Sequence, residues 1–398
     1  MQKLTVSGFL GVAHAEVRLD GLTVLIGAQA SGKSVVARLF YFFNEYFADF
    51  DELALLKNEH KKTYDSRKRI DFYKIFPPYS WQDDAFEICF ENGAHSVKIR
   101  SEANSSTVEL TSSKSVADYF RNLKRSFQSF VADYPDGDTL PQTRMLREFR
   151  RMHESLQVEK YERSLFVPAA RSFYSTIREE IFSILSLDEK IDRIIMQFGE
   201  FYENAKSSIR YVPDRGGRSV TRKVDYSTVE KEYFSKIVKG QYVRVDERDW
   251  IEMERGRIEL SKASSGQQEA VPLLIALSRF PSPGRTLIIE EPEAHLFPES
   301  QVQMLDFIVR QAVSRRTNIM FTTHSPYLLS ALNNYILRGF YGMDRSINID
   351  RVNAYSLGGG KTESIIDAET SLISADYIDS VSERIDEEFV SVLGHANV

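Results

Sequence analysis

The segment LTVLIGAQASGKS, residues 22–34, constrains the fold more than any other part of the chain. It joins an apolar, β-branched stretch to the pattern G-x-x-x-x-G-K-[ST], and apolar side chains follow at helical spacing. A strand, a glycine-rich loop and a helix N-terminus in this order place backbone N–H groups around a phosphate. The sequence therefore predicts an α/β fold with a phosphate-binding loop between a strand and a helix.

The residues of this loop have separate expected roles in binding ATP. Gly27 and Gly32 permit backbone angles and a close approach that a Cβ atom would prevent. Lys33 is expected to reach the β- and γ-phosphates, and Ser34 to place its hydroxyl on Mg²⁺. ATP and Mg²⁺ are therefore the expected cofactors. The residues expected to contact ATP are Gly27, Ala28, Gln29, Ala30, Ser31, Gly32, Lys33 and Ser34.

A second motif, TLIIEEPEAHLFP at residues 286–298, predicts a buried strand that ends in two carboxylates. Glu290 is expected to hold the magnesium ion through water, whereas Glu291 orients and deprotonates the attacking water. A solvated acidic loop is the alternative interpretation. The abrupt change from four apolar residues to carboxylates and Pro292 favours the strand end.

The stretch NIMFTTHSP, residues 318–326, predicts another apolar strand, with His324 at its carboxyl end. An isolated histidine in this position would more commonly be structural. Because we expect a parallel strand beside the one that enters the phosphate-binding loop, His324 can reach the γ-phosphate. We interpret His324 and Glu291 as the candidate catalytic side chains.

The stretch SSGQQE, residues 264–269, contains neither metal ligands nor a nucleophile with its base. Its serines suit a helix N-cap, its glycine leaves the backbone bare, and a helical apolar pattern follows. Since another loop already cradles the chain's own nucleotide, this one is expected to cap the γ-phosphate bound to a second copy. An ordinary Ser/Gly turn is the alternative. The residues concerned are Ser264, Ser265, Gly266 and Gln267.

The motifs GAQASGKS, SSGQQE, LIIEEPEAHLFP and TTHSP, in this order, resemble those of ABC-type ATPases of the SMC and RecF kind within the AAA family. They are most similar to the OLD-related branch (overcoming lysogenization defect), which includes ATPase subunits of anti-phage systems such as Septu and PARIS. The resemblance covers residues 1–48 and about 240–370. It implies a P-loop ATPase head with a mixed sheet, helices and an antiparallel β subdomain. It also implies two heads that enclose two nucleotides, each site taking its signature from the partner.

The same resemblance assigns roles outside the phosphate loop. His295 matches the loop that crosses the dimer interface, and His324 matches the switch histidine. Arg171, in LFVPAARSFY, would lie near the nucleotide in place of a Q-loop glutamine. A plain buried strand carrying a surface arginine is the alternative there. The chain departs from the family pattern at Glu290, where most members have aspartate, and at Phe297, where a histidine is frequent.

The separation of the motifs predicts an insertion, because far more residues lie between GAQASGKS and SSGQQE than a minimal P-loop fold needs. We expect the ATPase head in residues 1–112 and 241–398. Residues 113–240 form a mainly helical insertion, interrupted by a core strand near 165–171. We expect it to make a compact helical lid, since no heptad pattern runs for the length of an SMC arm.

Local patterns predict several further elements. Residues 86–100 alternate like two strands around an Asn-Gly turn. Residues 357–364, LGGGKTES, favour a hairpin turn over a second phosphate loop. Helical spacing is present in residues 114–134, 144–164, 175–206 and 373–393.

Basic side chains gather in two places. One is a helical stripe that could follow a nucleic-acid backbone, although glutamates dilute it and a solvated helix face is the alternative. The other is the segment 210–223, which is expected to be a loop that could meet nucleic acid or a protein partner. The stripe consists of Arg144, Arg147, Arg150 and Arg151, with Arg121, Lys124 and Arg125 upstream.

Composition limits the remaining function classes. A net charge of -6 argues against a generally basic nucleic-acid-binding protein, so any such contact is local. A single cysteine, Cys89, excludes internal disulfides and zinc clusters, and no apolar run approaches the roughly 20 residues that span a bilayer. We therefore expect a cytoplasmic protein without a membrane contact.

The expected function is that of an ATPase which dimerises around ATP in a bacterial anti-phage defence or toxin-like system. We expect it to control a separately encoded effector, such as a nuclease, because no Toprim-like acidic cluster or HNH-like histidine cluster follows the head. The alternative is a RecF-like or SMC-like repair ATPase that closes on duplex DNA. The expected partners are a second copy, the effector and, through the basic groups, nucleic acid.

Overall fold

The structure is a computed structural model. It describes residues 1–50, 55–133, 142–155, 161–176, 192–207, 221–222, 227–245, 248–374 and 386–392.

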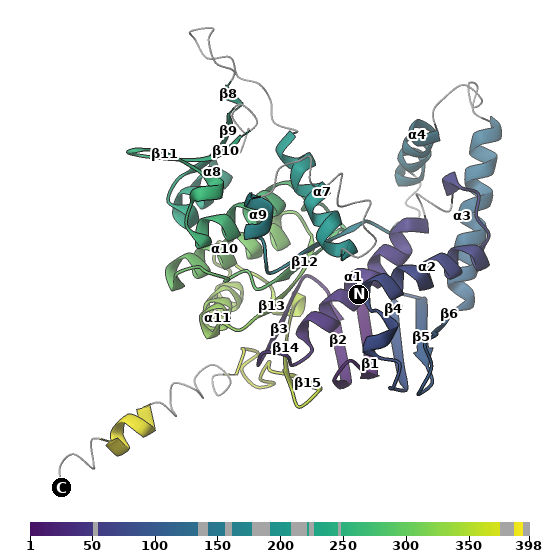
Figure 1. Cartoon of the computed structure of the whole chain (residues 1–398), viewed down its shortest axis with the longest axis horizontal. Coiled ribbons are helices and arrows are strands. Elements are labelled where there is room, and N and C mark those ends of the chain that lie inside the picture. Colours follow the sequence, from purple (N-terminus) through teal and green to yellow (C-terminus); the bar gives the residue numbers. More distant parts are fainter. Residues whose placement is uncertain are drawn as a thin grey trace.

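An 11-stranded mixed sheet forms the centre of the fold, in the order β6-β5-β4-β1-β2-β15-β14-β3-β13-β12-β7 (Figure 1). The last five strands run parallel to one another. Strands β3, β12 and β7 are buried along their whole length, which is why they read as short apolar runs rather than alternating patterns. The five parallel strands are β14 (Val352–Gly358), β3 (Leu22–Gly27), β13 (Asn318–Thr323), β12 (Thr286–Glu290) and β7 (Ser164–Val167).

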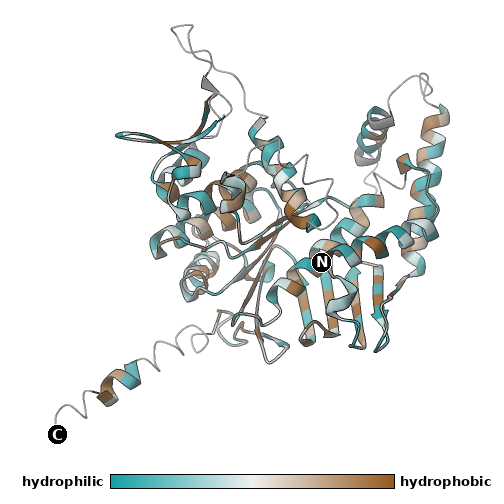
Figure 2. Cartoon of the chain, viewed as in Figure 1, coloured by the Kyte–Doolittle hydropathy of each residue, from teal (hydrophilic) through white to brown (hydrophobic). Residues whose placement is uncertain are grey.

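The other strands extend the same sheet through antiparallel pairs, except that β15 pairs with β2 in parallel. The hairpin predicted around Asn92 and Gly93 is confirmed, with Gly93 at a φ of 58°. Polar and apolar residues alternate along these strands, which appear as bands of two colours in Figure 2. Their bounds are β1 (Gln2–Phe9), β2 (Val12–Leu19), β4 (Phe86–Asn92), β5 (His95–Ser101), β6 (Glu109–Ser112) and β15 (Lys361–Ser364).

Helices cover both faces of the sheet. Neighbouring residues of β3 illustrate the two layers, since Val24 belongs to one buried apolar cluster and Leu25 to another. The cluster of Leu25 includes α1 (Lys33–Asp49) and α2 (Lys61–Ile75). The cluster of Val24 includes α7 (Arg193–Ser207), α8 (Thr228–Val238), α9 (Ser265–Arg279), α10 (Pro298–Ser314) and α11 (Pro326–Phe340).

The residues between α2 and SSGQQE that the structure describes form several separate structural elements. Helices α3 (Lys114–Asp133) and α4 (Gln142–Ser155) pack together and lie on the opposite side of the molecule from α8–α11 in Figure 1. Strand β7 joins the central sheet beside β12, and the short helix α5 (Ser172–Thr176) follows it. A second sheet precedes α9 and contains β8 (Thr221–Arg222), β9 (Gln241–Val245), β10 (Arg248–Met253) and β11 (Gly256–Glu259).

Most local expectations can be compared with these elements. Helical structure is confirmed for residues 114–133 and 193–207, and the hairpin of β14 and β15 is confirmed, with Gly359 and Gly360 at its turn. The expected helix over residues 373–393 lies mainly outside the described residues. The part of it that the structure describes as helical is residues 386–392. The basic segment 210–223 also falls outside them, apart from β8. None of the described helices has the length and apolar character that a membrane span requires.

Candidate functional site

The phosphate-binding loop connects the end of β3 to the start of α1, as predicted. Gly32 is the N-cap of α1 with a φ of 100°, a backbone conformation that favours glycine. A Cβ atom on Gly27 would lie 2.3 Å from the carbonyl oxygen of Leu357 on the neighbouring strand β14. Both glycines of the motif are therefore required by local packing, before any ligand is considered.

Replacing Gly27 by alanine is expected to destabilise the fold by about 1–3 kcal/mol, the usual effect of overpacking a filled site. The contact at 2.3 Å is between backbone and Cβ, so β3 and β14 would have to separate at the loop. Thermal unfolding measures the change. Gly358→Ala is the matched control, because a Cβ atom there meets nothing within 4 Å. Equal unfolding temperatures for the two variants would contradict the prediction.

The side chain of Lys33 lies inside this loop. Its Nζ donates to the carbonyl oxygens of Gly27 and Ala28, both at 2.8 Å. Burial lowers the pKa of the ammonium group, and the nearby carboxylates of Glu291 and Glu293 oppose that shift. The ammonium thus occupies the centre of the loop between neutral carbonyls, where phosphate oxygens would be stronger partners. Ala28, Gln29 and Ala30 are exposed, Ser31 is half-buried, and Ser34 is exposed in the first turn of α1.

The two carboxylates of the second motif differ in their surroundings. Glu290 is the last residue of β12 and is buried. Glu291 follows with a φ of 45°, and its backbone N–H donates to the carbonyl oxygen of Thr322 on β13 at 3.0 Å. A positive φ in a residue with a side chain is uncommon and clusters at functional sites. This turn leaves the carboxylate of Glu291 partly exposed at the edge of the sheet, while Glu290 stays inside.

His324 lies beside Glu291. The strand β13 is parallel to both β3 and β12, so its carboxyl end brings His324 to the edge where Glu291 lies. The Nε2 atom of His324 is 3.5 Å from Oε1 of Glu291. The parallel register therefore places the two candidate catalytic side chains next to each other, at the same edge as the phosphate-binding loop.

Glu293 was not singled out from the sequence, although it holds this histidine loop in place. Its Oε1 accepts hydrogen bonds from the Oγ1 of Thr323 and from the backbone N–H of His324, both at 2.7 Å. The only signal in the sequence is its position two residues after Glu291 in EEPEAH. A third carboxylate after a strand could not be assigned to a backbone donor on another strand without the fold.

Two side chains fit the expected magnesium position. The Ser34 hydroxyl is exposed at the start of α1, and the buried Glu290 carboxylate has no hydrogen bond or ion pair to any residue that the structure describes. A largely buried carboxylate without a protein donor suits a hydrated cation, and Mg²⁺ usually keeps several waters and takes few protein ligands. When bound there, Mg²⁺ would neutralise negative charge on the β- and γ-phosphates.

The residues of SSGQQE form the N-terminus of α9, as predicted. Ser264 is the N-cap, and its side chain and that of Gln267 form a capping box. The Nε2 of Gln267 also donates to the carbonyl oxygen of Val238 at 2.8 Å, so this amide stabilises the helix start from within the chain. Ser264 and Ser265 are exposed. Between the described residues 264–267 and 27–34 there is no hydrogen bond or ion pair.

The alternative of a plain strand with a surface arginine is wrong for Arg171. Strand β7 ends at Val167, so Arg171 lies beyond the strand, and its side chain is only 1% exposed rather than at the surface. Its guanidinium group donates to backbone carbonyls of the second motif, including that of Glu291 at 2.9 Å. The arginine is therefore close to the catalytic edge, but its donors are used by the protein and not held out toward a nucleotide.

The loop that contains His295 and the start of α9 are in direct contact. His295 has a φ of 57° within the tight turn that follows Glu291. A Cβ atom on Gly266 would lie 2.7 Å from the carbonyl oxygen of His295. The glycine of SSGQQE therefore allows this turn to pack against α9 within one chain.

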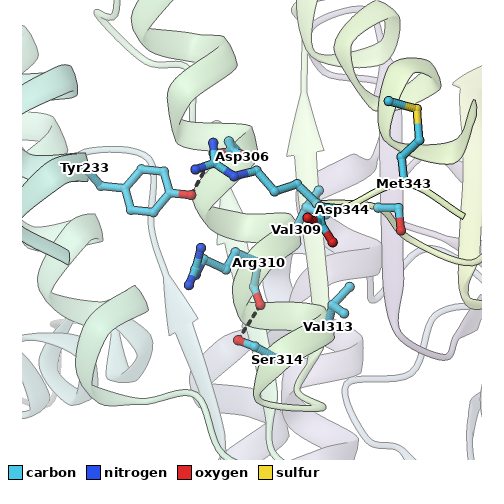
Figure 3. A pocket seen from close by; sticks show the side chains of 10 residues that line it. Tyr233, Asp306, Val309, Arg310, Val313, Ser314, Met343 and Asp344 are labelled. Atoms are coloured by element: carbon cyan, nitrogen blue, oxygen red, sulfur yellow. Dashed lines mark hydrogen bonds and ion pairs between the residues drawn. The ribbon is translucent and has the colours of Figure 1, made fainter. Parts of the chain in front are cut away.

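A cavity of about 300 Å³ lies elsewhere, between α8, α10 and the segment after α11 (Figure 3). The Tyr233 hydroxyl donates to Oδ2 of Asp306 at 2.7 Å on its wall, and Nη1 of Arg345 lies 3.7 Å from the same oxygen. None of its lining residues belongs to the four motifs. These contacts join α8, α10 and the loop, and we assign no ligand to this cavity.

Comparison with solved structures finds heads of SMC proteins. An SMC head bound to the C-winged helix domain of ScpA is 13% identical, with a TM-score of 0.41, and covers 92% of this chain and 97% of that one. An SMC head with an extended coiled coil from Pyrococcus furiosus, bound to the C-terminal domain of ScpA, is 12% identical with a TM-score of 0.39. That match covers 97% of this chain and 100% of the other. The SMC head domain from Thermotoga maritima is 14% identical with a TM-score of 0.37, and the match covers 91% of this chain and 97% of the other. No curated protein matches the chain.

The family comparison covers most of the chain. The model of the AAA ATPase domain family matches residues 1–329, which include all four motifs and both catalytic candidates. The fold is α/β, with a large mixed sheet between helices and with the four motifs at one edge of its parallel strands. The chain therefore belongs to the AAA ATPase domain family and is an ATP-hydrolysing enzyme.

Proposed function

We propose that this ATPase forms a homodimer around ATP and that its nucleotide state controls a separate effector protein. The observation that carries the proposal is the incomplete site of a single chain. The described residues 264–267 present an exposed helix N-terminus, yet no hydrogen bond or ion pair connects them to the phosphate-binding loop of the same chain. A helix N-terminus is suited to binding an anion. The γ-phosphate of ATP bound to a second copy of the chain would be that anion.

Exposed aromatic side chains near the catalytic edge support this choice of partner. Phe297 is 76% exposed at the N-cap of α10, and Tyr327 is 55% exposed in the first turn of α11. The two helix starts are connected by a hydrogen bond from Ser325 Oγ to Gln301 Oε1 at 2.6 Å. Large aromatic side chains are enriched in the buried centre of protein interfaces. Phe297, which replaces a histidine of the family pattern, is thus suited to an apolar contact with the partner.

The dimer has a direct test in solution. With ATP and Mg²⁺, the Glu291→Gln chain is expected to double its mass in light scattering, because ATP would stay bound between two copies. Adding Phe297→Glu should keep the chain monomeric, since an unpaired carboxylate would be buried at the interface. Tyr79→Glu is the control, because Tyr79 is 79% exposed in a turn outside the motifs. A monomer under all conditions would refute the dimer.

The biological setting is proposed from the motifs. They resemble those of ATPase subunits in bacterial anti-phage and toxin-like systems, in which a separate effector causes the damage. The test is affinity purification of the Glu291→Gln chain from its native host with ATP and Mg²⁺, followed by mass measurement. A stoichiometric small protein would support control of an effector. Nucleic-acid degradation by the purified chain alone, dependent on Glu291, would contradict the division of labour.

A DNA-binding clamp is the second candidate, favoured by one surface. Arg144, Arg147 and Arg151 are exposed on α4, although Arg151 pairs with Glu148 at 3.2 Å. Upstream, Arg121 pairs with Asp118, and Lys124 donates to backbone carbonyls, so those two cations are already engaged. A clamp predicts ATP-stimulated, salt-sensitive binding to duplex DNA that is lost when the α4 arginines become glutamates. DNA affinity unchanged by that reversal would remove this candidate.

A further inference from the structure

The guanidinium group of Arg171 connects three segments that are distant in sequence. Nε donates to the carbonyl oxygen of Glu269 at 3.1 Å, and Nη2 donates to that of Glu291 at 2.9 Å. Nη1 donates to the carbonyl oxygens of Pro168 at 3.0 Å and Glu290 at 2.7 Å. A planar fork with several N–H donors can satisfy such diverging acceptors, whereas a lysine ammonium on a single nitrogen cannot.

Glu269 holds the other side of this connection. It lies in α9, shortly after the N-cap Ser264, and is 3% exposed. Its carboxylate accepts the backbone N–H of Arg171 at 2.9 Å and that of Ser172 at 3.0 Å. Its Oε2 is also 3.4 Å from Nε of Arg171. The start of α9 is therefore fixed to Arg171 through both the side chain and the backbone of one residue.

Arg171 binds the backbone of Glu291, the candidate base, and so fixes the orientation of that residue. Glu291 has its N–H bonded to β13 and its carbonyl oxygen bonded to Arg171, so the bonds on both sides define its left-handed conformation. The contact of Gly266 with the His295 carbonyl brings the first turn of α9 against the following turn. A shift of α9 would consequently move the backbone of Glu291. Misplacement by about 1 Å can cost 10²-fold in rate.

We propose that Arg171 is a positioning residue that couples the two nucleotides of the dimer, and this inference rests on the proposed dimer. Residues 264–267 contact the nucleotide bound to the partner, and Glu269 transmits the position of α9 to Arg171. Arg171 then sets the backbone of Glu290 and Glu291, which act on the chain's own nucleotide. Hydrolysis at one site thereby depends on the nucleotide at the other.

The first test compares Arg171→Lys and Glu269→Gln with the wild type. Both are expected to lower kcat at saturating ATP by about tenfold or more, from misplacement of Glu291, while the Kd for ATP stays within about twofold because the phosphate-binding loop is unchanged. Arg285→Lys is the matched control, since Arg285 donates to the carbonyl oxygen of Phe280 and sits just before the opposite end of β12. A parallel rise in Kd would indicate a folding role and overturn the proposal.

The two variants separate coupling from local support. Glu269→Gln leaves the hydrogen bonds from Arg171 to the carbonyls of Glu290 and Glu291 intact. In the wild type, the two carboxylate oxygens of Glu269 accept two backbone N–H groups, and in the variant an amide NH₂ group would face one of these donors instead of an oxygen. If this variant keeps wild-type kcat while Arg171→Lys does not, Arg171 supports only the second motif. That result would overturn the coupling.

Mixed dimers with two affinity tags locate the effect within one chain. One chain carries Glu291→Gln, so turnover occurs only at Glu291 of the other. Arg171→Lys in the active chain is expected to lower turnover strongly, and the same change in the inactive chain to have a much smaller effect. Equal losses in both arrangements would overturn the proposal. If the Glu291→Gln chain alone forms no ATP-dependent dimer, that result refutes the proposed dimer itself, and with it the coupling that depends on the dimer.

Discussion

The Glu291→Gln chain is expected to hydrolyse ATP about 10²–10⁴-fold more slowly than the wild type, the usual effect of losing a positioned base. The amide cannot take a proton from the attacking water. The substitution retains the size of the side chain and the backbone bonds of Glu291 to Thr322 and Arg171. ATP binding should therefore remain, and the dimer should persist longer.

Steady-state phosphate release and equilibrium ATP binding measure the two effects separately. Glu299→Gln is the control, because Glu299 is an exposed acidic residue in the first turn of the adjacent helix α10. It should leave both quantities unchanged. Wild-type turnover in the Glu291→Gln chain would place the base elsewhere. Loss of ATP binding would show that the carboxylate is needed for the nucleotide itself.

The strands that carry the motifs could be predicted because their signals are local. An apolar run followed at once by GAQASGKS, by EEP or by HSP shows where each strand ends, and β3, β12 and β13 end at those places. The carboxyl ends of neighbouring parallel strands meet at one edge. The predicted parallel strand beside β3 is confirmed as β13. Its further pairing with β12, which the structure shows, places His324 beside Glu291.

The supporting contacts could not be predicted, because they join residues that are far apart in sequence. Glu269 binds the backbone of Arg171, and Arg171 binds the carbonyl of Glu291, over separations of 98 and 120 residues. No spacing rule identifies which carbonyl a buried guanidinium will meet. The same holds for Glu293, whose partner is a backbone N–H on another strand. These side chains are identified by hydrogen bonds in the fold, and not by a sequence pattern.

Lys33→Ala is expected to weaken ATP binding by at least about 10- to 100-fold, the range for losing a hydrogen bond that a charged donor makes. Removing the ammonium leaves the carbonyl oxygens of Gly27 and Ala28 facing the loop without their donor. Phosphate oxygens would then meet two partial negative charges where a cation had been. The defect should appear in binding, in contrast to Glu291→Gln.

The matched control for Lys33→Ala is Lys361→Ala, since both lysines follow glycines in short polar runs. Lys361 is exposed at the start of β15, after a hairpin turn and without a helix behind it, so its loss should not change ATP affinity. Fluorescent-nucleotide titration measures both variants. If Lys361→Ala reduced affinity as much as Lys33→Ala, the glycine-rich hairpin would also contact the nucleotide. If Lys33→Ala bound ATP normally, the loop between β3 and α1 would not be the phosphate site, because its only cation would be dispensable.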